Sequence, residues 1–429
     1  MKKIFTLSIL LTIIGVFNQT KVLAEEGYEI DYVCSRDYKE ATLNFLNWGE
    51  YIDDELIDIF EDKCNAKVIM EEADSNETMK TRLTSGAEKY DLMTPSDYMI
   101  ENLANGNMLA ELDYNNIPNY KYTDQDNQEQ IVFAEEFLSK PFDPDNKYSI
   151  PYFWGTVGIM YNKEKLAELN VKESELDSWS ILWDVRLENE IFMYESHRDL
   201  FMVALKLLGY SVNQGDLSDE DYQAQIDEAK QILIKQRSLV RAYGTDNIKK
   251  GITNGDAAVG VVYSGDYLDV MFELLEEGTE ETIGYKVPEE GTNMWFDAFV
   301  IPKQTDNKAL AEEFINFMLD PQVAYLNAAY VGYPTPHTLA YKLLSEDEDY
   351  KDLVTLDAYY PNEETLGKAE VYQDLGQKMN EYIAEAFMSI KQEKISAFQI
   401  AMIATVSVLI VGGVAYKFIS KRRKMTTNA

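Results

Sequence analysis

The sequence predicts an α/β protein of two lobes or domains, preceded by a secretory signal and followed by a transmembrane helix. Its 429 residues exceed what one ordinary hydrophobic core accommodates, so a fold of two parts is the default expectation. The first third alternates strand-like and helix-like segments with short connections, which is typical of a parallel sheet covered on both faces. Each end of the chain carries an apolar segment that lies outside this pattern.

The alternation starts with ATLNFLNW at 41–48, whose apolar and aromatic residues indicate a strand. The elements expected after it are a helix at 53–64 opened by an Asp cap, a strand at 67–71, a helix at 75–86 between Ser75 and Gly86, a strand at 90–95 and a helix that ends at Ala104. In such sheets ligands bind beyond the carboxyl ends of the strands. Residues 48–51 and 96–98 are therefore expected to border a cleft.

The middle of the chain, from 155 to 295, continues in the same style. Its clearest stretch is AAVGVVYSGDYLDVMFELLEEG at 257–278, which predicts a buried strand, a Ser-Gly-Asp turn and a helix. Two acidic segments, at 212–222 and 345–351, are expected to be solvated surface.

The segment MWFDAFVIP at 294–302 predicts a buried strand, because aromatic and β-branched residues fill it and a proline closes it. It leads to helices expected near 308–319 and 321–330. Asp297 lies between aromatic neighbours in the middle of this strand, where a carboxylate without a partner would cost several kcal/mol. The pattern therefore predicts that Asp297 faces a positive group.

The two ends have the form of membrane-targeting segments. Residues 1–24 carry two lysines, an apolar run and a small-residue cleavage site after Ala24, which is the pattern of a secretory signal. Residues 397–416 contain no charge over 20 residues, which suffices for a transmembrane helix, and the basic tail at 417–429 follows. Because basic clusters stay on the cytoplasmic side, residues 25–395 are expected as an ectodomain at the extracytoplasmic face of the cell membrane, anchored by a single pass.

The charge of this ectodomain limits its partners. Three of the 39 basic residues precede residue 25 and five follow residue 395, whereas all 75 acidic residues lie between them. The region therefore holds 31 basic residues and a formal charge of −44. This balance argues against nucleic acid and anionic lipid as partners, and it suits a cationic ligand, although solubility alone explains most of the carboxylates.

Signatures of enzymes and metal sites are scarce. The sequence has two histidines, His197 and His337, and neither a Gly-rich phosphate loop nor a GxSxG nucleophile elbow. A hydrogen-bonded structural role suits His197 better than a metal site. Cys34 and Cys64 are compatible both with a disulfide, which an exported domain permits, and with two unpaired thiols. The sequence thus indicates no catalytic residue, no cofactor and no metal.

An aromatic residue instead recurs beside small polar or acidic residues near the ends of the expected strands. The six instances are NWGEY (47–51), PSDY (95–98), YESHRD (194–199), VYSGD (262–266), MWFD (294–297) and VGYPTP (331–336). Aromatic faces attract ammonium groups and cover methylene chains, and carboxylates pair with ammonium groups. Each instance alone is compatible with core packing or a helix cap, but six of them near cleft edges favour a ligand site.

These motifs also resemble a family. The segments NWGEY, SNETM, YDLMTPSDY, KPFDPDNKYSIPYFWGT, SWSILWD, WFDAFVIP and GYPTP are similar, in order and spacing, to the spermidine/putrescine-binding receptors of bacterial ABC importers, from about residue 40 to 385. The resemblance implies a two-lobed, periplasmic-binding-protein-like (type II) α/β fold with a ligand cleft between the lobes. The ranges expected are 25–154 and 298–342 for the first lobe and 155–297 and 343–390 for the second, with crossings near 153–156, 296–298 and 342.

The resemblance also implies a set of ligand-binding residues, carried over by motif. They are Trp48, Gly49, Glu50, Tyr51, Ser96, Asp97, Tyr98, Ser196, Asp199, Tyr263, Asp266, Trp295, Asp297, Tyr333 and Tyr372. The resemblance implies that Tyr263 stands where these receptors often carry Trp, that Tyr372 lies near a family amide contact, and that Asp297 and Asp199 pair with amines of the ligand. The residues that it implies for an aromatic box are Trp48, Tyr51, Tyr98, Trp295 and Tyr333. The carboxylates are mixed in type, because Ser196 replaces an acid of spermidine-type receptors and Asp266 matches an acid of putrescine-type receptors.

The hypothesis that follows is a membrane-anchored polyamine receptor, without catalysis, that delivers spermidine or putrescine to ABC permease subunits. The transmembrane tail departs from the family, whose members are usually free in the periplasm or held by a lipid. One alternative is a carbohydrate-active hydrolase that uses cleft carboxylates. Another is a ligand sensor, which would need a partner protein because only 13 residues follow Tyr416.

Overall fold

The computed structural model describes residues 28–245, 247–276 and 282–391. The signal expected at 1–24 and the transmembrane segment expected at 397–416 lie outside the described residues. Within the described ranges, no helix has the length and apolarity needed to cross a membrane.

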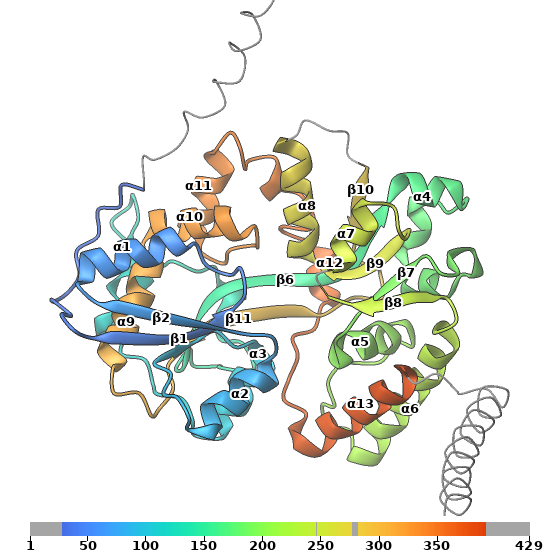
Figure 1. Cartoon of the computed structure of the whole chain (residues 1–429), viewed down its shortest axis with the longest axis horizontal. Coiled ribbons are helices and arrows are strands. Elements are labelled where there is room, and N and C mark those ends of the chain that lie inside the picture. Colours follow the sequence, from blue (N-terminus) through green and yellow to red (C-terminus); the bar gives the residue numbers. More distant parts are fainter. Residues whose placement is uncertain (1–27, 246, 277–281, 392–429) are drawn as a thin grey trace, which may run out of the picture.

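A nine-stranded mixed sheet runs along the molecule, with helices packed around both of its ends (Figure 1). Its strand order is β2-β1-β3-β11-β6-β9-β7-β8, and β10 pairs with β6. The strands are β1 Thr42–Trp48, β2 Lys67–Ala73, β3 Leu92–Met93, β6 Ser149–Asn162, β7 Ile191–Tyr194, β8 Val240–Gly244, β9 Val259–Tyr263, β10 Ile283–Lys286 and β11 Met294–Val300. A separate hairpin joins β4 Lys121–Thr123 and β5 Glu129–Ile131.

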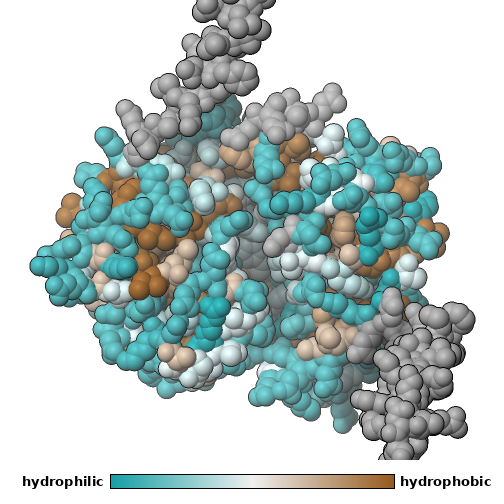
Figure 2. Space-filling model, in the orientation of Figure 1, coloured by the Kyte–Doolittle hydropathy of each residue, from teal (hydrophilic) through white to brown (hydrophobic). Residues whose placement is uncertain are grey.

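The helices divide between two lobes, which the figure shows on the left and on the right (Figure 1). The first lobe surrounds β1–β3 with α1 Asp54–Cys64, α2 Asn76–Ser85, α3 Asp97–Asn105, α9 Lys308–Met318, α10 Pro321–Val331 and α11 Thr338–Glu346. The second lobe surrounds β7–β9 with α4 Lys163–Glu168, α5 His197–Leu207, α6 Asp219–Gln236, α7 Asn247–Thr253, α8 Ser264–Glu276 and α13 Gly376–Lys391, and α12 Glu363–Lys368 precedes α13. Hydrophilic residues cover most of the visible face of both lobes, as the excess of acidic residues requires (Figure 2).

Local signals set the boundaries of the first elements. The side chain of Asp53 accepts a hydrogen bond from the Glu55 amide at 3.0 Å and caps α1, and Ser75 caps α2 in the same way. Asn65 and Gly86 end these helices in the left-handed conformation. Strands β1, β2 and β3 are parallel, as the alternation predicted.

Two long strands join the lobes. The first part of β6 pairs with β11, and its later part, from Val157 to Tyr161, pairs with β9 in the second lobe. Trp295 of β11 lies opposite Gly155 of β6, and a Cβ on Gly155 would stand 2.7 Å from the indole. Glycine is therefore required where the large site residue Trp295 covers the neighbouring strand.

A third connection reaches the second lobe near Glu370. The carbonyl of Glu370 accepts from the Met294 amide at 3.0 Å, and its carboxylate pairs with the buried Lys206 of α5. The Asn213 amide donates to the Val371 carbonyl at 2.8 Å and fixes the segment that follows. The crossing expected near 342 falls within α11, which packs against α10 of the first lobe, so the predicted lobe boundaries stay a prediction.

One local expectation was wrong. Ser264, Gly265 and Asp266 form the first turn of α8 instead of a separate turn, so the helix begins directly at the end of β9. The acidic residues of the segment 212–222 are exposed, as expected, although α6 begins at Asp219 and the side chain of Tyr222 is fully buried. Acidic residues in a first turn favour a helix N-terminus, which explains why a charge run opens this helix.

A disulfide between Cys34 and Cys64 settles the alternatives that the sequence left open. The two Cα atoms lie 5.4 Å apart, and the bond ties the segment before β1 to the last residue of α1. It closes a loop with a sequence separation of 30 residues. Constraint of this loop in the unfolded chain should stabilise the first lobe.

We expect the double substitution Cys34→Ser and Cys64→Ser to lower the free energy of unfolding by roughly 2–4 kcal/mol, because the unfolded chain regains the entropy of the closed loop. Chemical denaturation of the oxidised wild type and of the variant measures the difference. The reduced wild type is the matched control and should behave as the variant does. Equal stability of all three would show that the bond does not constrain the unfolded state.

Candidate ligand-binding site

A continuous chain of aromatic rings links the two lobes beside the crossing strands. The ring centroids of Tyr51 and Tyr333 lie 5.6 Å apart, those of Tyr333 and Trp295 5.5 Å, and those of Trp295 and Tyr263 5.7 Å. Tyr51 follows β1, Tyr333 follows the left-handed Gly332 that ends α10, and Tyr263 ends β9. The first lobe thus contributes one end of the chain of rings and the second lobe the other.

Asp297 lies at the first-lobe end of this chain. Its side chain is buried, and Oδ2 accepts a hydrogen bond from the Tyr51 hydroxyl at 2.8 Å, whereas Oδ1 has no partner. Burial raises the pKa of Asp297 to about 7, although the neighbouring hydroxyls of Ser96 and Tyr51 act in the opposite direction. The pairing of β11 with β6 shifts register between Asp297 and Ala298, and a bulge of this kind re-aims a side chain.

Asp199 lies at the second-lobe end. It is buried in the first turn of α5, where Oδ2 accepts from the Tyr263 hydroxyl at 2.8 Å and Oδ1 from the Tyr372 hydroxyl at 2.9 Å. Burial, reinforced by Asp199, holds the pKa of both tyrosines well above their usual value, so both remain hydrogen-bond donors. The Ser196 hydroxyl caps α5 by accepting from the Asp199 amide at 3.3 Å.

Asp97 joins two elements of the first lobe. Its carboxylate accepts from the Tyr98 amide at 2.6 Å and from the Phe296 amide at 3.2 Å, and it is fully buried. Burial raises the pKa of Asp97, and the nearby Asp297 contributes to the shift. These bonds hold the start of α3 against β11, beside the bridge between Ser96 and Asp297.

Asp266 and Tyr333 define the side of the site next to α8. Asp266 Oδ2 accepts from the Tyr263 amide at 3.2 Å, which ties the end of β9 to the first turn of α8. The Tyr333 ring covers Gly265 so closely that a Cβ there would stand 2.1 Å from it. Glycine is thus required for the two lobes to meet at this point.

The remaining predicted residues lie at the margin. Gly49 and Glu50 are exposed in the turn after β1. Trp48 is half-buried, and its indole donates to the Thr94 carbonyl at 2.7 Å. Within the described part of the chain, no ring contact joins Trp48 to the aromatic rings of the site.

The sequence motifs missed two residues that the structure places at the site. Asn76 donates to the Ser96 hydroxyl at 3.0 Å and accepts from the Ser96 amide at 2.9 Å, so it orients this serine. Arg198 lies over the rings of Tyr372 and Tyr98, at 4.3 and 5.6 Å from their centroids. The available signals were the basic residue within YESHRD for Arg198 and, for Asn76, the segment SNETM, which is one of those that carry the resemblance.

Comparison with known proteins shows the family to which the chain belongs. A family model described as "Bacterial extracellular solute-binding protein" matches residues 55–358. The chain belongs to this family. This solute-binding protein is 32% identical over 336 residues to the spermidine/putrescine-binding periplasmic protein of Salmonella typhimurium, covering 78% of this chain and 87% of that protein. It is 27% identical to the putrescine-binding periplasmic protein SpuD of Pseudomonas aeruginosa, covering 82% and 92% of the two chains.

Solved structures agree with these relatives. The spermidine/putrescine ABC transporter substrate-binding protein PotD of Streptococcus pneumoniae superposes with a TM-score of 0.66 at 35% identity, covering 82% of this chain and 99% of that one. The expected periplasmic-binding-protein-like α/β fold and the resemblance to spermidine/putrescine-binding receptors are thereby confirmed. The family consists of extracellular solute-binding proteins, so the expectation of a binding protein without catalysis is confirmed as well.

We expect the free energy of unfolding of ligand-free Asp297→Asn, relative to that of the wild type, to be higher at pH 8 than at pH 5. An unfolded Asp titrates near pH 3.9, so between about pH 4 and pH 7 the folded wild type keeps a proton that its unfolded chain loses. The free energy of unfolding of the wild type therefore falls across this window, by a few kcal/mol at most, and the amide avoids this loss.

Denaturation of both proteins at pH 5 and pH 8 measures the effect. Asp306→Asn is the matched control, because that carboxylate is exposed and pairs with Lys89 on the surface. The two variants should differ in their pH dependence, and an equal dependence would contradict a raised pKa at Asp297.

Proposed function

We propose that this solute-binding protein is the polyamine receptor of an ABC importer. The relatives supply the ligand class, since they are named for spermidine and putrescine. The candidate site has groups that suit this ligand class, because a buried carboxylate lies at each of its two ends and aromatic rings lie between them. A linear polyamine has the complementary pattern, with ammonium groups separated by methylene chains.

The observation that carries the proposal is the unpartnered Oδ1 of Asp297. A buried carboxylate with an unpartnered oxygen and no cation is costly, and an ammonium group of the ligand supplies both the missing charge and a donor. The adjacent rings of Tyr51, Tyr333 and Trp295 then cover the methylene groups and attract the cation. Asp199, with its two tyrosine donors, is proposed to hold the next ammonium group along the ligand.

Ligand binding is proposed to stabilise the closed form. Asp297 and Tyr51 reach the ligand from the first-lobe side, whereas Asp199 and Tyr263 reach it from the second lobe. A ligand held at both ends has more contacts when the lobes meet, so binding shifts the population towards closure. The permease subunits then recognise the closed receptor. The 15 residues carried over by motif are proposed as the ligand-binding set, with Asn76 orienting Ser96.

The receptor is further proposed to be anchored at the extracytoplasmic face by residues 397–416, whose uncharged sequence suits a membrane span. Attachment next to the permease raises the effective concentration of the receptor there, which compensates for weak docking. The basic tail at 417–429 fixes the orientation.

We expect Asp297→Asn to weaken putrescine and spermidine binding by at least about tenfold, on the order of 2 kcal/mol, because the amide removes the charge that compensates the ammonium group. Calorimetry on the purified full-length protein near pH 8 gives the dissociation constants. Asp306→Asn removes an exposed acid and should leave them unchanged. Near-native affinity of Asp297→Asn would remove this residue from the site, and no binding of either polyamine by the wild type would refute the function.

We expect a chain truncated after Ile395 to leave the membrane fraction while it keeps the polyamine affinity of the full-length protein. The reason is that the uncharged segment 397–416 is removed, whereas the described site is intact. Fractionation of cells that express each form, with an alkaline wash of the membranes, makes the comparison. A truncated protein that stays with the washed membranes would contradict anchoring by this segment.

A further inference from the structure

A guanidinium group is buried beside the proposed polyamine site. Arg198 belongs to the first turn of α5 and is only 5% exposed. Its guanidinium carbon lies 4.3 Å from the ring centroid of Tyr372 and 5.6 Å from that of Tyr98, and these rings themselves meet edge to face at 6.5 Å. The protein's own cation therefore occupies the aromatic pair at this end of the site.

Arg198 forms no salt bridge among the described residues, although its charge opposes the rise that burial causes in the pKa of Asp97 and Glu101. Nη1 donates to the carbonyl of Gln373 at 3.2 Å, and Nη2 is buried without a hydrogen-bond partner. No ion pair to Arg198 is present among residues 28–245, 247–276 and 282–391, although acidic residues outnumber basic ones almost two to one in the chain. A guanidinium is always charged, so a full positive charge remains at this point.

Tyr372 links the charge of Arg198 to the carboxylate of Asp199. The Tyr372 hydroxyl donates to Asp199 Oδ1 at 2.9 Å, while the face of the same ring contacts the guanidinium of Arg198. The Tyr372 side chain thus separates a ligand ammonium group on Asp199 from a fixed cation. An ammonium group placed on the far side of Tyr372 would meet a buried like charge that no salt bridge compensates.

The opposite side of the site has a different electrostatic character. Lys249 pairs with Asp269 of α8, so its charge is locally neutralised. Burial lowers the pKa of Lys249, but Asp269, Asp266 and Glu50 outweigh this effect and raise it. On the α8 side the cation is thus paired with a carboxylate, whereas on the α5 side Arg198 forms no salt bridge among the described residues.

We propose that Arg198 is a specificity-determining residue that closes the α5 end of the site against a further ammonium group. The proposal rests on the proposed polyamine function and sharpens it. The ligand class is a linear polyamine whose terminal ammonium group pairs with Asp199, with any additional amines on the side of Asp297. Polyamines too long to fit between these limits are rejected by charge as well as by length.

The experiment compares putrescine, a diamine, with spermine, a tetramine, by calorimetry on full-length protein near pH 8. The readout is the ratio of the spermine to the putrescine dissociation constant. Arg198→Met keeps the packing of an unbranched stem against the rings, and Arg198→Gln keeps a hydrogen-bond donor. Both should lower the ratio by at least about tenfold, because the repulsion beyond Asp199 is removed. Arg198→Lys keeps the charge and should stay within about threefold of the wild type.

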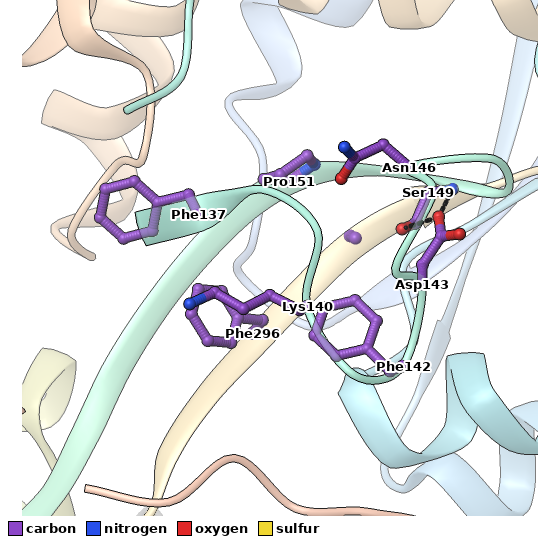
Figure 3. Close-up of a pocket in the computed structure, with 9 residues that line it drawn as sticks. Phe137, Lys140, Phe142, Asp143, Asn146, Ser149, Pro151 and Phe296 are labelled. Atoms are coloured by element: carbon purple, nitrogen blue, oxygen red, sulfur yellow. Dashed lines mark hydrogen bonds between the residues drawn. The ribbon is translucent and has the colours of Figure 1, made fainter. Parts of the chain in front are cut away.

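Lys140→Gln is the matched control for the general loss of a positive charge. The Lys140 ammonium lies 5.3 Å from the Phe296 ring centroid and has no ion pair among the described residues (Figure 3). Phe296 precedes Asp297 in β11, so its side chain is on the opposite face of the strand. Lys140→Gln therefore removes a cation without an ion pair from the neighbourhood of the site and leaves the α5 end of the site unchanged. Its ratio of spermine to putrescine dissociation constants should match that of the wild type.

The outcomes separate the two proposals. A wild type that binds putrescine and spermine equally tightly overturns the role of Arg198, even if both charge-removing variants fail to fold. An unchanged ratio in folded Arg198→Met or Arg198→Gln also overturns it, as does an equal fall of the ratio in Lys140→Gln. Failure of the wild type to bind any polyamine refutes the proposed function itself.

Discussion

The burial of Asp297 without a cation is the interaction on which the rest of the site depends. The strand that carries it, β11, is fixed by its pairing with β6 and by the contact of the Phe296 amide with Asp97. The carboxylate is therefore held in a buried position. Its charge is favoured there by the Ser96 and Tyr51 hydroxyls, its cost is avoided by protonation, and a cation from outside would compensate it. The proposed ligand recognition uses the third of these possibilities.

The crossing strands also explain why the site can respond to closure. β6 is continuous between the lobes, and Trp295 lies across Gly155 at the point where the partner of β6 changes from β11 to β9. The chain of rings from Tyr51 to Tyr263 passes over the same point, so its contacts depend on how the lobes meet. In the proposed open form, a rotation about the crossing strands would separate Tyr333 from Gly265.

Much of this arrangement could be predicted where the cause is local. Asp53, Ser75 and Gly86 mark helix ends through their own hydrogen bonds and backbone conformations, and a buried acid in a strand indicates a missing cation at any position. Other features arise from residues far apart in the sequence and leave little local signal. Arg198 is covered by the rings of Tyr98 and Tyr372, which lie far from it in the sequence. The acidic residues at the start of α6 likewise make its buried side difficult to recognise in the sequence.

Two buried charges of opposite sign thus border the candidate site, and neither has a salt-bridge partner among the described residues. Asp297 retains an unpartnered oxygen, so an incoming ammonium group relieves its cost directly. Arg198 is held by two aromatic faces and one carbonyl, which stabilise a cation but do not remove its field. The proposed cationic ligand would consequently be attracted at one point and repelled beyond another. Aromatic rings alone would accept ammonium groups along their whole length, so on this proposal the positions of the two charges give the site a direction and an end.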